Sequence, residues 1–225
     1  MPGSIARLEP RLQAVAEEIC APTHADIGSD HALLPRYLLL SGRVQRVIVV
    51  EKNQGPWENS RRALEGLAAE VRLGDGLGAL SPGEADSLSL CGMGARLMVR
   101  ILSAHPARLP PRLVLQPNDS ALPLRQWALQ AGYALVNEQM VEGFWRYSIL
   151  TLERGACAAY SGLPLELALR FGPLTQKQAP PAQRRAAGAA KAARQAAAGG
   201  AGTARARACR ASPGAFARVL TDSVR

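Results

Sequence analysis

The sequence predicts an α/β fold in which helices cover both faces of a mostly parallel sheet. Short apolar runs ending in small or polar residues recur between residues 24 and 118, and stretches of helical length separate most of them. Two later runs, 133–142 and 145–154, have only a brief turn between them and predict an antiparallel hairpin. We therefore expect five parallel strands, a closing hairpin and a short basic, alanine-rich C-terminal extension.

The predicted elements follow one another in a regular order. The first is a helix over residues 7–19, whose apolar residues recur at helical spacing and predict packing beside the sheet. The parallel strands are expected at residues 24–28, 44–51, 70–76, 86–92 and 112–118. Further helices are expected at residues 31–42, 55–68 and 122–132.

Composition and charge divide the chain into two parts. It has 225 residues, of which 48% are hydrophobic, which is enough for one ordinary core. Basic and acidic residues balance over residues 1–175, so the net charge of +9 comes from residues 176–225. From about Ala179 the chain is rich in Ala, Arg, Gly and Pro, which favours a partial helix that frays into disorder. We predict a ligand-binding domain over residues 1–160 and a reduced helical segment with a basic tail over residues 161–225.

Metal-binding, secreted and membrane-spanning classes are disfavoured. Cys20, Cys91, Cys157 and Cys209 lie far apart without the paired spacing of zinc sites, and the 3 histidines form no cluster with them. No apolar run approaches the ~20 residues needed to span a bilayer, and residues near the N-terminus show no basic stretch leading into an apolar signal core. We expect a cytoplasmic monomer with reduced thiols, no metal and no membrane partner.

Ionisable residues cluster where the first two strands end. Asp26 closes the first strand, Gly28 follows in a tight turn, and Asp30 and His31 open the next helix. Ligands bind beyond the carboxyl ends of parallel strands, and a glycine there lets the backbone approach them closely. Glu51 ends the second strand, where an acid can accept hydrogen bonds from both ribose hydroxyls of a nucleotide. Each has a structural alternative: a helix cap for the aspartates, a surface position for Glu51 and a packing role for His31.

Glycines follow the third and fourth strands. Asp75 lies between two glycines, which permit an edge-on approach to an adenine ring, although such a stretch taken alone is also an ordinary turn. Gly92 and Gly94 leave room for a ligand beside the fourth strand.

The chain lacks the Gly-x-Gly-x-x-Gly fingerprint of dinucleotide sites. Asp26 and Asp30 would repel a pyrophosphate, but they would attract the ammonium and sulfonium groups of S-adenosylmethionine. The acids at the strand ends therefore predict a site for a cationic nucleoside that carries no phosphate.

Residues 7–172 resemble the bacterial tRNA (adenine(22)-N(1))-methyltransferase family through the segments "ADIGSDHALLP", "GDGL", "GEAD", "GMG", "LVLQPN", "LRQWALQAGYALV" and "YSIL". The resemblance implies a Rossmann-like class I methyltransferase fold, S-adenosylmethionine as cofactor and tRNA as substrate. The chain departs from the family at Ala95, where a further glycine is usual, and in its short tail, where the family has a helical C-terminal domain.

The resemblance also assigns roles to individual residues. The methionine end of the cofactor is assigned to Asp26, Gly28, Asp30 and His31, its ribose to Glu51 and its adenine to Asp75. The cofactor side of the reaction site further includes Gly92, Met93 and Gly94. The target base is implied to lie at "GMG" and at Gln116, Pro117 and Asn118.

Methyl transfer to a ring nitrogen needs little proton chemistry, because that nitrogen attacks with its own lone pair. Positioning and electrostatic stabilisation then provide most of the catalysis. Asn118 is the best candidate for reading the base, since its amide both donates and accepts, and Asp119 is a candidate acceptor for the exocyclic amine. For Asn118 the alternative is a cap of the helix that begins near Leu122.

The basic tail is a candidate RNA contact. We assign phosphate contacts to Arg184, Arg185, Lys191 and Arg194, with Arg205, Arg207 and Arg210 as further members, and a solvated extension is the alternative. Two other functions stay open: a methyltransferase acting on another substrate, and a non-catalytic RNA-binding protein of the same fold.

Overall fold

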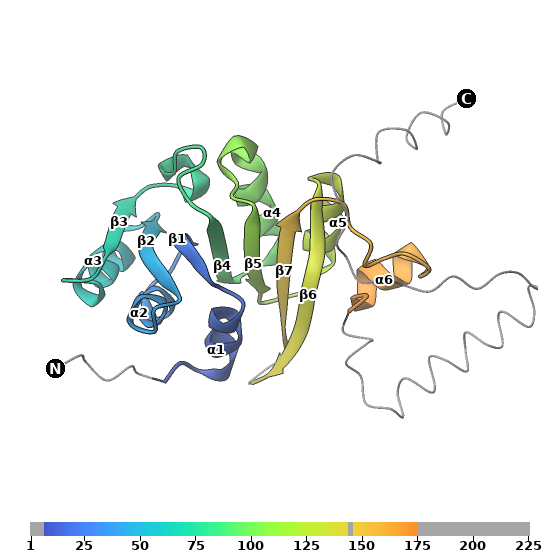
Figure 1. The fold of residues 1–225 in the computed structure, drawn as a ribbon, viewed down its shortest axis with the longest axis horizontal. Coiled ribbons are helices and arrows are strands. Elements are labelled where there is room, and N and C mark those ends of the chain that lie inside the picture. The colour runs from blue at the N-terminus through green and yellow to red at the C-terminus, as the bar shows by residue number, and fades with distance from the viewer. Residues whose placement is uncertain (1–6, 144–145, 175–225) are drawn as a thin grey trace, which may run out of the picture. The chain divides into compact units, whose positions relative to one another are not determined.

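The structure is a computed structural model that describes residues 7–143 and 146–174. Its sheet has 7 strands in the order β3-β2-β1-β4-β5-β7-β6 (Figure 1). The strands are β1 (Ala21–Ile27), β2 (Val44–Glu51), β3 (Ala69–Leu73), β4 (Ser87–Met93), β5 (Arg112–Pro117), β6 (Tyr133–Glu142) and β7 (Arg146–Arg154). The predicted frayed helix after Ala179 and the assigned basic residues Arg184, Arg185, Lys191 and Arg194 lie outside the described residues.

The predicted topology is confirmed. Strands β3, β2, β1, β4 and β5 are parallel, whereas β7 runs antiparallel between β5 and β6. The chain builds outward from β1 to β3 on one side and from β4 to β6 on the other. A switch point therefore lies between β1 and β4, the place where open α/β sheets bind their ligands.

Helices cover both faces of this sheet (Figure 1). They are α1 (Pro10–Glu17), α2 (Leu33–Leu40), α3 (Gln54–Ala63), α4 (Ala95–Ala104), α5 (Leu122–Gln130) and α6 (Leu165–Phe171), with short 3-10 turns η1 (Gly76–Ala79) and η2 (Pro106–Arg108). Val47 and Val49 of β2 face the cluster formed with α1 and α2, whereas Ile48 and Val50 face the cluster formed with α4 and α5. Burial on both faces explains the unbroken apolar run of β2.

All four helices predicted at residues 7–19, 31–42, 55–68 and 122–132 are shorter in the structure, and backbone geometry explains the second and the third. The helix expected at residues 31–42 begins at Leu33, because Asp30 and Ala32 have left-handed φ values of 62° and 52°. The helix expected at residues 55–68 ends at Ala63, and the turn that follows contains Gly66 at a φ of 76°.

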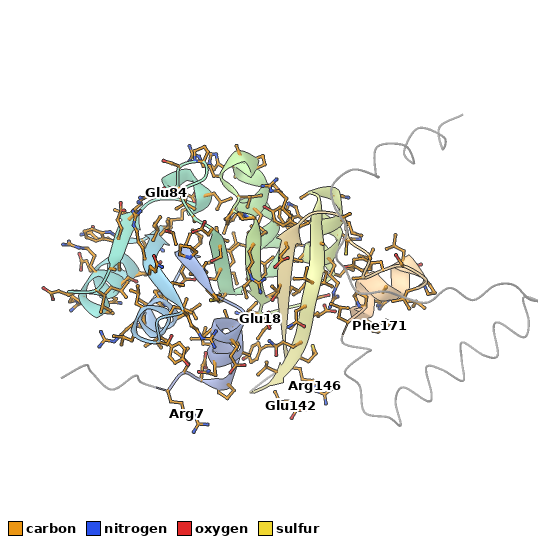
Figure 2. The ribbon with its side chains drawn as sticks, in the orientation of Figure 1. Arg7, Glu18, Glu84, Glu142, Arg146 and Phe171 are labelled. Atoms are coloured by element: carbon orange, nitrogen blue, oxygen red, sulfur yellow. The ribbon has the colours of Figure 1, made fainter. Side chains whose placement is uncertain are left out.

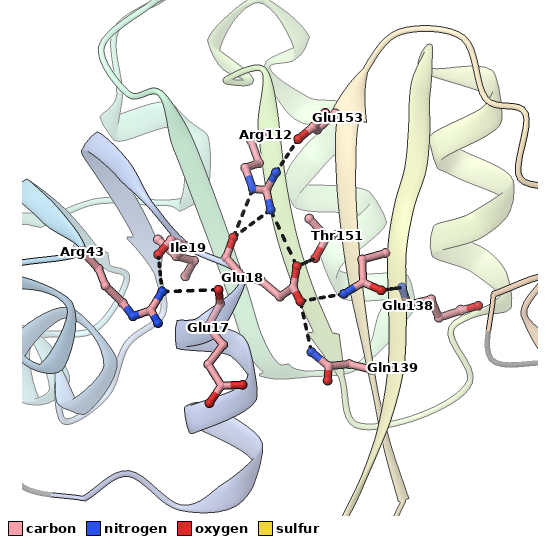
Figure 3. Close-up of polar contacts among 10 residues, drawn as sticks. Glu17, Glu18, Ile19, Arg43, Arg112, Glu138, Gln139, Thr151 and Glu153 are labelled. Atoms are coloured by element: carbon pink, nitrogen blue, oxygen red, sulfur yellow. Dashed lines mark hydrogen bonds and ion pairs between the residues drawn. The ribbon is translucent and has the colours of Figure 1, made fainter. Parts of the chain in front are cut away.

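The first helix is fixed to the sheet by a polar cluster at its C-terminal end. The Glu18 carboxylate accepts hydrogen bonds from Asn137 Nδ2 at 2.6 Å, Thr151 Oγ1 at 2.8 Å and Gln139 Nε2 at 3.3 Å (Figure 3). The Arg112 guanidinium donates to the backbone carbonyl of Glu18. Helix α1 is thereby held to β5, β6 and β7.

A buried ion pair holds the last described helix. The Arg125 guanidinium of α5 contacts Glu138 Oε1 of β6 at 2.6–2.7 Å, and both side chains are buried. Arg125 Nη1 also donates to the carbonyl of Leu169 in α6 at 2.7 Å. Residues 165–171 therefore pack against α5, and the division predicted at residue 160 stays a prediction.

Candidate active site

A cavity of about 730 Å³ lies where β1, β2 and β3 end. Its apolar lining includes Ile27, Val50, Leu77 and Ile101, and its polar lining includes Glu51, Lys52, Asp75, Arg100 and His105. Of the predicted cofactor residues, the cavity brings together Gly28, Glu51, Asp75 and Met93. Small-molecule sites typically have volumes of roughly 300–1,000 Å³, so this cavity is of a suitable size for such a ligand.

Glu51 is held at the tip of β2 by the turn that follows β1. Its Oε1 accepts the backbone N–H of Asp30 at 2.6 Å and the Ser60 hydroxyl at 3.4 Å. The side chain is buried, and this burial raises the pKa of the carboxyl despite the hydrogen bonds. A fixed carboxylate in the cavity wall can accept further hydrogen bonds from a ligand's hydroxyl groups.

Gly28 is required by a close contact as well as by its backbone. Its φ of +74° favours glycine, and a Cβ at this position would lie 2.3 Å from Met93 Cε. The Met93 side chain of β4 thus packs directly on the backbone after β1.

Asp75 lies at the edge of the cavity and pairs with Lys52. Lys52 Nζ is 2.8 Å from Asp75 Oδ2, and this contact lowers the pKa of the aspartate. Both side chains are exposed, so solvent screens the attraction. The adenine contact predicted for Asp75 would have to share this carboxylate with Lys52.

Asp26 is not part of the cavity lining. It is buried in β1 and accepts a hydrogen bond from the Ser89 hydroxyl, and burial raises the pKa of the carboxyl. His24 bridges Ser87 and Ser89 with two contacts of 2.8 Å, and burial lowers the pKa of its imidazole to about 3. Because Ser89 gives its proton to Asp26, His24 Nε2 must carry the hydrogen and Nδ1 must accept from Ser87.

Asp30 and His31 are exposed and do not line the cavity. Their side chains lie 3.4 Å apart and are about two-thirds exposed, at 67% and 66%. The left-handed backbone at Asp30 directs its N–H toward Glu51. The structure thus gives Asp30 a role through its backbone, and the cofactor contacts predicted for both side chains stay predictions.

The segment Gln116–Asn118 fixes the backbone of Gly92. Gln116 Oε1 accepts the Gly92 N–H at 3.1 Å, and Asn118 Nδ2 donates to the Gly92 carbonyl at 2.6 Å. Gly92 has a φ of +72°, and the β4–β5 register shifts between Cys91 and Met93. Two amide side chains therefore hold a bulge beside Met93, with Pro117 buried between them.

Asp119 caps α4. Its Oδ1 accepts the Ala95 N–H at 2.7 Å, and Oδ2 would lie 3.4 Å from a Cβ on Gly94. This contact occupies one oxygen of the carboxylate proposed to accept from the exocyclic amine. The alternative cap predicted for Asn118 is not observed, because α5 begins after Ala121 and Ser120 Oγ accepts the Leu122 N–H at 3.4 Å.

Sequence reasoning missed several residues of this region. Lys52 follows Glu51 in the chain, and its position next to a predicted site residue could have indicated that it lines the cavity. Arg11 of α1 meets Gln116 of β5 and Tyr147 of β7 only through packing between distant segments. Arg100 and His105 reach the cavity wall in the same way. Within residues 7–143 and 146–174, no three metal-ligating side chains gather, and no helix is long and apolar enough to cross a membrane.

The chain is similar to known proteins over most of its length. The family model described as tRNA (adenine(22)-N(1))-methyltransferase matches residues 24–197. A curated Bacillus subtilis protein of that description is 40% identical over 181 residues, covering 76% of each chain.

Solved structures agree with this match. The crystal structure of the B. subtilis m1A22 tRNA methyltransferase superposes with a TM-score of 0.74 at 36% identity, covering 85% of this chain and 86% of that one. Sp1610 of Streptococcus pneumoniae in complex with S-adenosyl-L-methionine superposes with a TM-score of 0.69 at 31% identity, covering 83% and 89%. The chain belongs to the tRNA (adenine(22)-N(1))-methyltransferase family.

Proposed function

We propose that the protein transfers a methyl group from S-adenosylmethionine to ring nitrogen 1 of adenine 22 in tRNA. The observation that carries this function is the cavity at the carboxyl ends of β1, β2 and β3, which combines the Glu51 carboxylate with an apolar wall. Family membership supports this reaction, because the B. subtilis relative, which is 40% identical, is described as a tRNA (adenine(22)-N(1))-methyltransferase. tRNA is the partner and the cytoplasm the proposed location.

The residues of the cavity fit this cofactor. Glu51 is positioned to accept hydrogen bonds from ribose hydroxyls, and Leu77 and Ile101 offer an apolar surface for the adenine ring. Gly28 and Met93 border the end of the cavity that faces β4, where the reacting group would have to lie. Asp26, buried in β1, and Asp30, exposed in the turn that follows, do not line the cavity, so the fit to the cofactor rests on Glu51, Gly28 and Met93.

When bound, S-adenosylmethionine supplies the methyl group on a positively charged sulfur. The adenine nitrogen lone pair forms the new N–C bond, the S–C bond breaks with its electrons remaining on sulfur, and the positive charge passes to the adenine ring. A proton need not be removed before this step. The protein therefore contributes mainly by holding the adenine nitrogen in the orientation that the displacement requires.

The residues at the end of β4 provide this placement. Gln116 and Asn118 fix the Gly92 backbone, and the exposed Asn118 amide keeps a second N–H for the incoming base. The target nucleotide must leave the stacked tRNA to reach this point, at a cost of a few kcal/mol. Contacts with the rest of the tRNA have to offset that cost.

The direct test is a methylation assay with mapping of the product. Purified protein is incubated with tRNA and labelled S-adenosylmethionine, and the modified nucleotide is located by nuclease digestion and mass spectrometry. We expect one 1-methyladenosine at position 22, and none in a tRNA that carries guanine there. Label at another nucleotide, or cofactor binding without any transfer, would contradict the proposal.

A further inference from the structure

Arg11 lies at the junction of four elements beside the proposed reaction site. Its Nη1 donates to Gln116 Oε1 of β5, and its guanidinium carbon lies 5.5 Å from the centre of the Tyr147 ring of β7. The same guanidinium would be 3.8 Å from a Cβ on Gly92 of β4. Nη2 pairs with Glu9, an exposed carboxylate just before α1.

This junction is open to solvent on the side where a substrate must arrive. Gly92 and Asn118 are exposed, and the Arg11 side chain keeps 21% of its surface accessible. Next to Tyr147 in the chain, the exposed Arg146 begins β7 and pairs with the exposed Glu142, which ends β6 (Figure 2). Gly92 is followed by Met93, a residue that lines the cofactor cavity, so the junction is adjacent to that cavity.

The charge that the reaction creates decides which group can face the base. Methylation leaves the adenine ring positively charged, and a guanidinium stacked on that ring would oppose the transfer. An aromatic face attracts a cation, and the Tyr147 ring already holds one in the form of Arg11. A guanidinium, in contrast, suits the phosphate of a nucleotide, with which it forms charge-assisted hydrogen bonds.

We propose that Tyr147 and Arg11 together receive the target nucleotide: the Tyr147 ring stacks on the adenine, and the Arg11 guanidinium moves from that ring to the nucleotide's phosphate. The inference rests on the proposed tRNA methylation. Tyr147 strengthens its contact as the ring becomes cationic, so it acts on the methyl-transfer step. Arg11 acts on binding, and Glu9 competes with the phosphate for it.

The two roles predict different kinetic effects. Tyr147→Leu should lower the single-turnover rate at saturating tRNA by about tenfold, whereas Tyr147→Phe, which keeps the ring, should stay within about twofold of the unaltered protein. Arg11→Ala should raise the tRNA dissociation constant by about tenfold and reduce its salt slope by about one. Arg11→Lys should recover part of the affinity, and Glu9→Gln should tighten binding.

A matched control lies on the outer helix α3. Arg61 stacks over Trp57 at 4.7 Å, the same kind of pair away from the cavity, so Arg61→Ala should leave the transfer rate unchanged. Thermal unfolding and calorimetry with S-adenosylmethionine should show that each variant folds and binds the cofactor normally. Filter binding of tRNA across salt concentrations measures Arg11 and Glu9 without any turnover.

The outcomes separate this inference from the proposed function. An unchanged transfer rate in folded Tyr147→Leu, an equal loss in Tyr147→Phe, or an unchanged salt slope in Arg11→Ala would overturn it. Methylation of another nucleotide would contradict the assignment of adenine 22, and the same variants would then be assayed on that nucleotide. If the protein transfers no methyl group at all, the proposed function fails and the role of Tyr147 in transfer fails with it.

Discussion

Neighbouring carboxylates in this site differ through their surroundings. Asp26 is enclosed by β1 and β4 and bound to Ser89, whereas Glu51 stands in the cavity wall and accepts the Asp30 N–H. Burial raises the pKa of both groups, yet only Glu51 lines the cavity. The acid at the end of β2 is therefore the better candidate for a direct ligand contact.

The first prediction concerns Glu51. Glu51→Gln keeps an acceptor for the Asp30 N–H but removes the charge that strengthens hydrogen bonds to ribose hydroxyls. We expect S-adenosylmethionine affinity to fall by about tenfold, measured by calorimetry, with little change in stability. Glu58→Gln on α3 is the control, since Glu58 is exposed and lies outside the cavity. Equal affinity in both variants would remove Glu51 from the site.

The second prediction concerns His24 and acid stability. The imidazole pKa falls from 6.5 to about 3 in the fold, so the unfolded chain binds more protons between these values, and stability is lost as the pH drops below 6.5. Asp26 acts oppositely, because its raised pKa makes part of the stability present at low pH disappear as the pH rises. The advantage of the unaltered protein over His24→Asn should shrink by about 1.4 kcal/mol per pH unit in that window. Urea unfolding from pH 7 to pH 4 measures it, and parallel curves would contradict it.

Helix α1 links the proposed reaction site to the rest of the sheet. Its N-terminal turn places Arg11 beside Gln116, while its C-terminal end is held by Glu18 (Figure 3). The helix thus connects the polar cluster at one end of β5 to the amide cluster at the other.

The third prediction tests this attachment. Glu18→Ala leaves the side chains of Asn137, Gln139 and Thr151 without their shared acceptor and should cost about 2–3 kcal/mol of stability. Glu17→Ala, one residue earlier, removes only an exposed contact with Gln13 and should change stability by less than about 0.5 kcal/mol. Both values come from chemical unfolding, and similar losses would show that the cluster adds no stability.

The fourth prediction concerns the attachment of α6. Arg125→Met leaves Glu138 as an uncompensated buried charge, and Glu138 Oε2 already lacks a hydrogen-bond partner among the described residues. We expect a loss of about 3–5 kcal/mol, most of which should return in the double variant Arg125→Met with Glu138→Leu. The double-variant cycle measures the coupling, and additive losses would contradict a direct pair.

At the scale of the whole molecule, charge separates the folded part from the tail. The described residues belong to a stretch in which acids and bases balance, so the long-range attraction for RNA is expected to come from residues 176–225.

The fifth prediction tests the tail. Replacing Arg184, Arg185, Lys191 and Arg194 with Gln in the full chain should weaken tRNA binding and lower its salt slope by about one per lost phosphate contact. The affinity for S-adenosylmethionine should not change. A chain that ends at residue 175 should show the same weaker tRNA binding and the same unchanged affinity for S-adenosylmethionine. Unaltered tRNA affinity in both would identify the tail as a solvated extension.

Sequence alone determined the fold class and the strands on which the candidate residues lie. The features that predicted them are local: the alternation of strands and helices, the hairpin, and the glycines at strand ends. They can be read from the sequence because helices and strands differ in the spacing of their buried side chains, and because glycine adopts backbone conformations that other residues avoid. Glu51, Gly28 and Asp75 are found together for this reason: parallel strands bring their carboxyl ends to one edge of the sheet.

Only the tertiary structure decided how these residues are used. Asp26 was placed in a buried network by the register of β1 against β4, which sets His24 beside Ser87. Asp119 became a cap of α4, and Arg11 reached Gln116, 105 residues away, because α1 packs along the sheet. Such contacts depend on side-chain packing between distant segments, and no local period or turn chemistry in the chain encodes them.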